Sequence, residues 1–130
     1  MKPDNGNTMK MKITRYDSHG RASRVVEYNG VLYFEVHVAA DAKNRPMTMK
    51  EQASALLKRY DELLEKFGSS KRHILRAEII IRNVSLLDEF NVAWEEWVEE
   101  GYQPARVTTT GMTGPECYLV GIVMTAALKE

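Results

Sequence analysis

Apolar and polar positions alternate along several stretches of the chain, with the period of two that is typical of β-strands. The alternation is weak over residues 10–16 and stronger over 24–28. The dipeptide Asn29-Gly30 follows and fits the positive φ angles of a two-residue hairpin turn. Over residues 31–38 the pattern assigns one face to Leu32, Phe34, Val36 and Val38 and the other to Val31, Tyr33, Glu35 and His37. We therefore expect a hairpin whose second strand has a core face and a mixed face.

Two other segments repeat their apolar residues every three or four positions, which is the period of an amphipathic helix. The first begins at Thr48 and Glu51, which have capping-box spacing, and stops at Gly68. The second begins at Ser85, which can cap a helix, and stops before Gly101. Its apolar stripe consists of Leu86, Leu87, Phe90, Ala93, Trp94, Trp97 and Val98. This stripe places both tryptophans in the core.

Three further stretches, residues 73–83, 106–110 and 117–127, predict strands. The order of elements predicts an α+β fold, in which a single mixed β-sheet carries both helices on one face. The opposite face would then expose Tyr33, Ile74, Ile80, Leu119 and Val123. Because an apolar face of this size is unfavourable in water, we expect a second copy of the chain to cover it. The prediction is a homo-oligomer with clefts between its subunits.

Composition narrows the choice of function. The 130 residues suffice for one domain, and 18 Lys and Arg balance 18 Asp and Glu, so no net charge steers the chain to nucleic acid or an anionic membrane. Residues 1–10 predict a flexible segment ahead of a single domain over 11–130. With no signal or spanning stretch, we expect a cytoplasmic protein. We expect neither a metal nor a cofactor, because no ligand cluster or phosphate-binding loop occurs.

Several motifs, in this order and spacing, resemble the YjgF or Rid family of reactive-intermediate (imine) deaminases. They are Asn-Gly-Val-Leu-Tyr at 29–33, Gln52, Glu-Lys-Phe-Gly at 65–68, the run 90–97, Pro-Ala-Arg at 104–106 and the run 118–122. The resemblance covers about residues 22–127. It implies a chorismate-mutase-like fold assembled as a homotrimer. It also implies hydrolysis of enamines and imines to 2-oxo acids and ammonia, without a cofactor.

The resemblance also implies a binding site for a small carboxylate metabolite. Arg106 would bind the carboxylate, because a planar guanidinium can hold both of its oxygens. Asn91, Thr108 and Gly121 complete the substrate-binding set that the resemblance implies. Without the family, a surface ion pair is the preferred explanation of Arg106, and a hydrogen bond from the helix to a loop is the preferred explanation of Asn91. As a site residue, Asn91 is expected to brace the site and not to react.

Departures from the family pattern leave two functions open. The glutamate that positions the attacking water in deaminases is replaced by Gly121, and the family's Ser-Gly-Gln segment by Val36-His37-Val38. The first hypothesis is an imine deaminase with an altered site. The second is a non-catalytic ligand-binding or regulatory trimer that kept only the carboxylate clamp. Ribonuclease activity, known under older family names, is disfavoured by the zero net charge.

Glu35 and His37 are the candidates to replace the missing carboxylate. They are two residues apart on a predicted strand, so their side chains would share one face. A histidine can relay a proton and a carboxylate can activate water. The alternative is that they pair with Arg76 or Arg82 across strands at a subunit interface.

Overall fold

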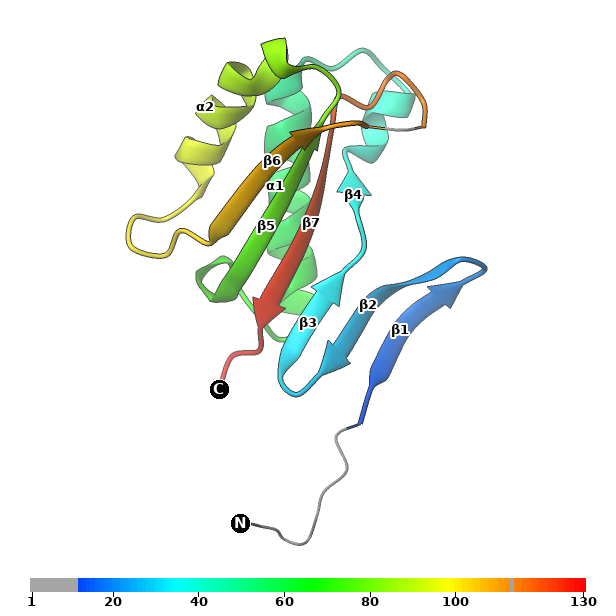
Figure 1. Cartoon of the computed structure of the whole chain (residues 1–130), viewed down its shortest axis with the longest axis vertical. Coiled ribbons are helices and arrows are strands. Elements are labelled where there is room, and N and C mark those ends of the chain that lie inside the picture. Colours follow the sequence, from blue (N-terminus) through cyan, green and yellow to red (C-terminus); the bar gives the residue numbers. More distant parts are fainter. Residues whose placement is uncertain (1–11, 113) are drawn as a thin grey trace, which may run out of the picture.

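The computed structural model describes residues 12–112 and 114–130, which form one mixed sheet and two main helices (Figure 1). The predicted flexible segment over residues 1–10 lies outside the described residues. The strands are β1 (Thr14–His19), β2 (Ala22–Tyr28), β3 (Val31–Phe34), β4 (His37–Val38), β5 (Ile74–Ile81), β6 (Ala105–Thr110) and β7 (Val120–Ala127). The helices are α1 (Met49–Lys66) and α2 (Leu87–Trp97), with short 3-10 turns η1 (Ala40–Lys43), η2 (Lys71–His73) and η3 (Val84–Leu86).

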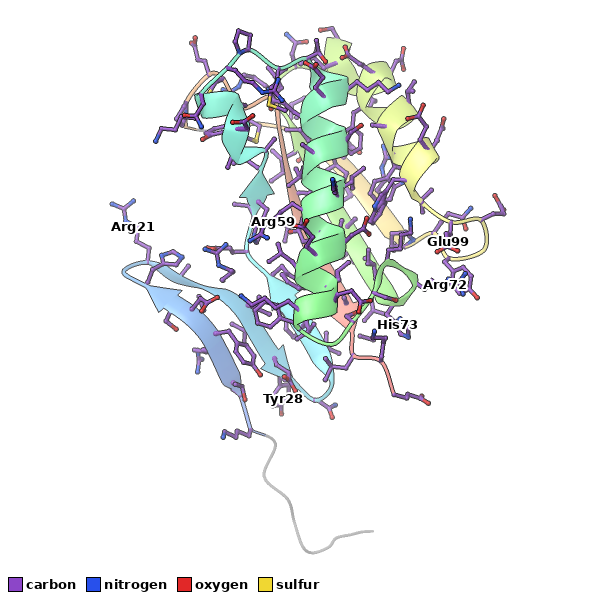
Figure 2. The ribbon with its side chains drawn as sticks, turned by 180° about the vertical axis from the view of Figure 1, so that it is seen from behind. Arg21, Tyr28, Arg59, Arg72, His73 and Glu99 are labelled. Carbon is purple, nitrogen blue, oxygen red and sulfur yellow. The ribbon has the colours of Figure 1, made fainter. Side chains whose placement is uncertain are left out.

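The sheet has the order β1-β2-β3-β7-β5-β6, and β4 pairs with β7 beyond the end of β3. Only β5 and β6 pair in parallel; the other pairs are antiparallel. Both helices lie on one face of the sheet, as the two opposite views show (Figures 1 and 2). The prediction of an α+β fold with a single mixed sheet and both helices on one face is therefore confirmed.

The short-range signals in the sequence are realised as predicted. Asn29 and Gly30 take φ angles of 54° and 79° and join β2 to β3 as a hairpin. The N-terminus of α1 carries a capping box, in which the amide of Glu51 donates to Oγ1 of Thr48 at 3.1 Å and the amide of Thr48 donates to Oε1 of Glu51 at 2.8 Å. Gly68 follows α1 with a φ of 88°, a conformation that favours glycine.

Several predicted boundaries are wrong. Residues 10 and 11 of the first predicted strand lie outside the described residues, and β1 begins at Thr14, after Lys12 and Ile13; the last strand begins at Val120 and not at Cys117. Ser85 does not cap α2, whose N-cap residue is Leu86 and which has no side-chain cap. Asn83 instead caps the turn η3 ahead of α2, because its Oδ1 accepts a hydrogen bond from the amide of Ser85 at 2.9 Å.

The strand predicted over 31–38 is interrupted, and the interruption changes which side chains are buried. Pairing with β2 ends near Glu35, and the chain resumes as β4 against β7. Val36, predicted in the core, is 48% exposed, whereas His37, predicted on the opposite face, is only 9% exposed. Side chains alternate faces along a strand, so an irregularity of this kind reverses the assignment beyond it.

A second irregularity lies in β5. Its pairing with β7 shifts register between Ile74 and Arg76, so Ile74 joins the core and Leu75 is 50% exposed. The prediction that Ile74 belongs to the uncovered face is therefore wrong. Tyr33 is exposed as predicted, and Ile80, Leu119 and Val123 are half-buried. Across the described ranges, no helix is both long and apolar enough to span a bilayer.

Candidate functional site

Arg106 is positioned by β6 and held by a short network of neutral groups. It pairs in register with the fully buried Ala77 of β5, so its side chain lies on the helix-covered face of the sheet, against α2. Its Nη2 donates to Oδ1 of Asn91 at 2.6 Å, and its Nε and Nη2 donate to Oγ1 of Thr108 at 3.3 and 3.2 Å. Two of the predicted site residues therefore orient the third.

Two aromatic rings of α2 complete the surroundings of this guanidinium. Its carbon lies 5.5 Å from the centroid of the Phe90 ring and 5.3 Å from that of Trp94, within the range of cation–π attraction. Both rings belong to the stripe that the sequence assigned to the core, so their contact with Arg106 was missed. The spacing of 90 and 94, one turn apart and beside Asn91, is the signal that could have indicated it.

Within the described part of the chain, the charge of Arg106 is not neutralised by an ion pair. Among the described residues, no carboxylate oxygen lies within salt-bridge distance of its guanidinium. Burial lowers the pKa of Arg106, and the charge of Glu95 partly offsets this effect, but a guanidinium stays protonated at neutral pH. Arg72 shows the contrasting case, since its Nε and Nη2 both bind the carboxylate of Glu99, at 3.1 and 2.8 Å (Figure 2).

A hollow of about 460 Å³ opens beside Arg106. It lies between α2 and the segment that leads to β6, and Arg106 is the one cation among the described residues of its lining. The other lining residues are Trp94, Glu95, Val98, Glu100 and Gln103. An anion in this hollow would contact the guanidinium at one end, whereas the two glutamates favour a cationic or hydrogen-bond-donating group at the other.

Gly121 lies in β7, between the buried Val120 and Ile122, and pairs with Ile80 and Val38. A Cβ built on it would stand 2.9 Å from Cγ2 of Val36 and 3.2 Å from Sδ of Met112. Val36 and Met112 also line an apolar pocket of about 230 Å³ on the face that the helices leave uncovered. Apolar side chains thus occupy the space beside Gly121.

Within one copy of the chain, Arg106 and Gly121 do not line a common pocket. Gly121 pairs with Ile80 on the uncovered face, whereas Arg106 pairs with Ala77 on the face covered by α2. The two positions therefore lie on opposite faces of the sheet and three residues apart along β5. One copy cannot present both to a single small ligand.

Glu35 and His37 do not form the predicted pair. Oε1 of Glu35 lies 3.1 Å from Nε2 of His19, whereas the His37 ring lies beneath α1, with Nδ1 2.9 Å from the carbonyl oxygen of Glu35. Within one copy of the chain, the arginines of the alternative pairing contact other groups: Arg76 contacts Glu78, and Arg82 donates to backbone carbonyls of the segment that precedes β7. Neither candidate lies in the hollow beside Arg106.

Burial and contacts keep His37 neutral at pH 7. Desolvation is the largest effect and lowers the pKa of His37, Arg24 lowers it further, and the hydrogen bond to the Glu35 carbonyl opposes both. That bond places the ring proton on Nδ1, so Nε2 accepts from Nη1 of Arg24 at 3.5 Å. Tyr60, fully buried beside it, donates to the carbonyl of Ile122 at 2.8 Å. His37 is thus part of the packed interior under α1.

Trp97 and Cys117 make hydrogen bonds that connect separate segments of the fold. Nε1 of Trp97 donates to Oδ2 of Asp61 at 3.1 Å, which joins α2 to α1. The Cys117 carbonyl accepts from Nε2 of Gln52 at 2.8 Å. Across residues 12–112 and 114–130, no group of three or more His, Cys, Asp or Glu side chains is placed to hold a metal ion.

Comparison with known proteins gives consistent matches over nearly the whole chain. Residues 12–128 match the family model described as endoribonuclease L-PSP. The chain is 35% identical over 119 residues to the RutC family protein YoaB of Escherichia coli, covering 91% of this chain and all of that one. It is 34% identical over 118 residues to a RutC family protein of Haemophilus ducreyi, covering 91% and 98%.

A solved structure agrees with these matches. The crystal structure of a YjgF family protein from Neisseria meningitidis superposes with a TM-score of 0.84 at 29% identity, covering 92% of this chain and 98% of that one. The predicted family is therefore confirmed by sequence and by fold. The chain belongs to the YjgF/RutC family, the group to which the L-PSP family model and these relatives point.

Proposed function

We propose that this protein binds small carboxylate metabolites through Arg106, in clefts between the subunits of a homotrimer, and hydrolyses imines or enamines of amino acids there. The observation that carries the proposal is a partly desolvated guanidinium whose protein partners, Asn91, Thr108 and two aromatic rings, are all neutral. Such a cation is oriented but not neutralised, so a ligand carboxylate is its natural counterion.

The hollow beside Arg106 supports an amino-acid imine as the ligand. At neutral pH such a molecule carries a carboxylate at one end and an iminium or amino nitrogen at the other. The carboxylate would bind Arg106, and the nitrogen would face Glu95 and Glu100. In the reaction, water adds to the C=N carbon and gives a carbinolamine. The C–N bond of this carbinolamine then breaks, which releases ammonia and forms a 2-oxo acid. A carboxylate that accepts a proton from this water speeds the addition.

A second copy of the chain would complete the cleft. Arg106 and Gly121 lie on opposite faces of one copy, so a site that contains both positions draws them from two subunits. The uncovered face presents exposed Tyr33 and Leu75, an apolar surface suited to such a contact. Glu35 could contribute to this cleft only from the neighbouring subunit, whereas His37 is buried under α1. The single cysteine, Cys117, fits the reducing cytoplasm, which we propose as the location.

The structure at Gly121 favours a second candidate function. Because Val36 and Met112 occupy the space next to this glycine, the chain lacks both the carboxylate and the room for one. The alternative is a non-catalytic ligand-binding or regulatory trimer that has lost the catalytic glutamate. Like the first proposal, it assigns the binding of the carboxylate to Arg106. It differs only in that the bound ligand is not hydrolysed.

The decay of 2-aminoacrylate, generated in situ, separates the two proposals. If the protein is a deaminase, the wild type accelerates ammonia release, and Arg106→Ala abolishes the acceleration. Arg21→Ala, which removes the same charge from the exposed β1–β2 turn, serves as the matched control and should leave the rate unchanged (Figure 2). Size-exclusion chromatography with light scattering tests the trimer, which should have three times the mass of one chain.

A variant at Gly121 tests the alternative. Gly121→Glu alone would collide with Val36, so it is combined with Val36→Ala, which removes the interfering methyl group. An inactive wild type that gains turnover in the double variant supports a degenerate site. The single variant Val36→Ala controls for the change in packing. If the wild type neither accelerates the decay nor binds a 2-oxo acid, both proposals fail.

A further inference from the structure

A second hollow, of about 280 Å³, lies on the helix-covered side of the sheet, between α1 and the chain that runs from β4 into η1. Its lining includes Arg24 from β2, Arg59 and Ala55 from α1, and His37, Ala39 and Ala40 from the segment between them. Figure 2 shows Arg59 on the side of α1 that faces β3 and β4. Residues far apart in the sequence thus bring two guanidiniums to one hollow.

The charges around this hollow leave an excess of positive charge. Arg24 meets Asp17 only at 3.6 Å and Arg59 meets Glu62 only at 3.4 Å, and all four side chains are substantially exposed to water. Asp41, an acidic residue in the lining, is bound by Nε of Arg45 at 2.7 Å. Pairs this long and this exposed neutralise little, so both guanidiniums retain their attraction for an anion.

His37 gives one side of the hollow a fixed geometry. Its Nδ1 donates to the carbonyl of Glu35 at 2.9 Å, and its ring is packed edge to face against Tyr60, 5.2 Å between centroids. With the ring held in this way, Nε2 accepts from Nη1 of Arg24 at 3.5 Å. Arg24 is therefore anchored at one nitrogen and has further N–H groups free to bind a ligand.

Apart from Asp41, the rest of the lining is apolar, and three of its residues are alanines. Ala39 is buried, whereas Ala40 and Ala55 are exposed, and none of the three has a side chain that fills the space. A hollow of this volume is just below the range of about 300–1,000 Å³ that is usual for drug-sized ligands. It is therefore suited to a small molecule with a short apolar chain.

From this arrangement we infer that the hollow binds a small organic acid, with its carboxylate between Arg24 and Arg59 and its apolar chain against Ala39, Ala40 and Ala55. The inference does not depend on the proposed function. Arg106 contacts α2 at the β6 edge of the sheet, whereas this hollow borders α1 beside β4, on the other side of β5 and β7. The two carboxylate sites are distinct in position and in lining.

Titration with butanoate, followed by NMR on the ¹⁵N-labelled protein, tests the inference. The side-chain Nε–H signals of Arg24 and Arg59 and the amide signals of Ala39, Ala40 and Ala55 should shift together and saturate. Arg24→Gln and Arg59→Gln should each weaken binding at this site by about tenfold or more, because a charged hydrogen bond is lost. Lys58→Gln, which removes a charge from the neighbouring position of α1 outside the hollow, should change it less than twofold.

Filling the hollow gives a test that leaves both arginines in place. Ala55 is exposed on α1, so Ala55→Leu should preserve the fold and still abolish the shifts at this site. Arg106→Ala should leave them intact. The inference is overturned if butanoate shifts only Arg106 and its neighbours, or if Ala55→Leu binds as well as the wild type. Binding of inorganic phosphate as tightly as butanoate would also overturn it, since charge alone would then explain the attraction.

Discussion

Replacing Asn91 with aspartate should weaken carboxylate binding without weakening the fold. The two side chains have nearly the same shape, so a carboxylate oxygen would stand where Oδ1 of Asn91 now accepts from Nη2 of Arg106 at 2.6 Å. Arg106 would then carry an internal counterion. The variant therefore changes whether the guanidinium charge is available while keeping its position.

The size of the effect follows from the distance and the exposure. Two unit charges about 4 Å apart interact by about 1 kcal/mol in water and about 4 kcal/mol near a protein surface. Arg106 is only partly buried, so the lower part of this range applies, about 1–2 kcal/mol. A ligand carboxylate repelled by this amount should bind about 5- to 30-fold more weakly. The same charge pair should leave the free energy of unfolding unchanged or raise it by up to about 1 kcal/mol.

Isothermal titration calorimetry with 2-oxobutanoate measures the binding, and urea denaturation measures the stability. Asn91→Ala is the matched control, because it removes the same hydrogen bond without adding a charge, and Thr108 still accepts from Arg106. It should weaken binding less than Asn91→Asp does. The reasoning is refuted if a folded Asn91→Asp protein binds 2-oxobutanoate as tightly as the wild type, since the free charge of Arg106 would then not be the clamp.

Three further predictions concern the interior beside α1. Tyr60→Phe should lower the free energy of unfolding by about 1–3 kcal/mol in urea denaturation, because the buried Ile122 carbonyl loses its donor; an unchanged midpoint would show that the bond contributes nothing. Gln52→Leu should lower the free energy of unfolding by at least about 2 kcal/mol in the same assay. Gln52 is fully buried, donates to the carbonyls of Met47 and Cys117 and accepts from the amide of Leu119. Gln52→Glu keeps the acceptor but lacks the donors, so it should not restore the stability. Burial lowers the pKa of His37 in the folded protein, so on acidification the unfolded chain binds a proton at His37 before the folded protein does. The free energy of unfolding should therefore fall as the pH drops below about 6.5, by at most about 1.4 kcal/mol per pH unit. His37→Gln should make urea midpoints at pH 7.5 and 5.5 more alike, and an equally steep loss in the variant would assign the effect to other groups.

Features that depend on a few neighbouring residues were predictable from the sequence. The Asn29-Gly30 turn needs only positive φ angles, and the capping box of Thr48 and Glu51 needs only their spacing. The apolar stripe of α1 and family motifs such as Pro-Ala-Arg at 104–106 could be recognised in the sequence for the same reason. Local chemistry of this kind does not depend on how distant elements pack.

The assignment of faces required the tertiary structure. The interruption before His37 and the register shift after Ile74 each leave the composition of the strand unchanged and reverse which side chains are buried. Because the period along a strand is two, one irregularity moves every later side chain to the other face. The predicted pair of Glu35 and His37 failed for this reason.

The sequence alone determined the order of the elements, the sheet with its two helices and the family, and it singled out Arg106 as the arginine proposed to bind the ligand. Only the packing of α2 on β6 decided that Asn91, Phe90 and Trp94 surround Arg106. Only the packing of α1 beside β2 and β4 brought Arg24, His37 and Arg59 to one hollow. The physical reason is that strand and helix formation depend on neighbours in the chain, whereas a site depends on side chains that approach each other when separate elements bury their apolar faces together.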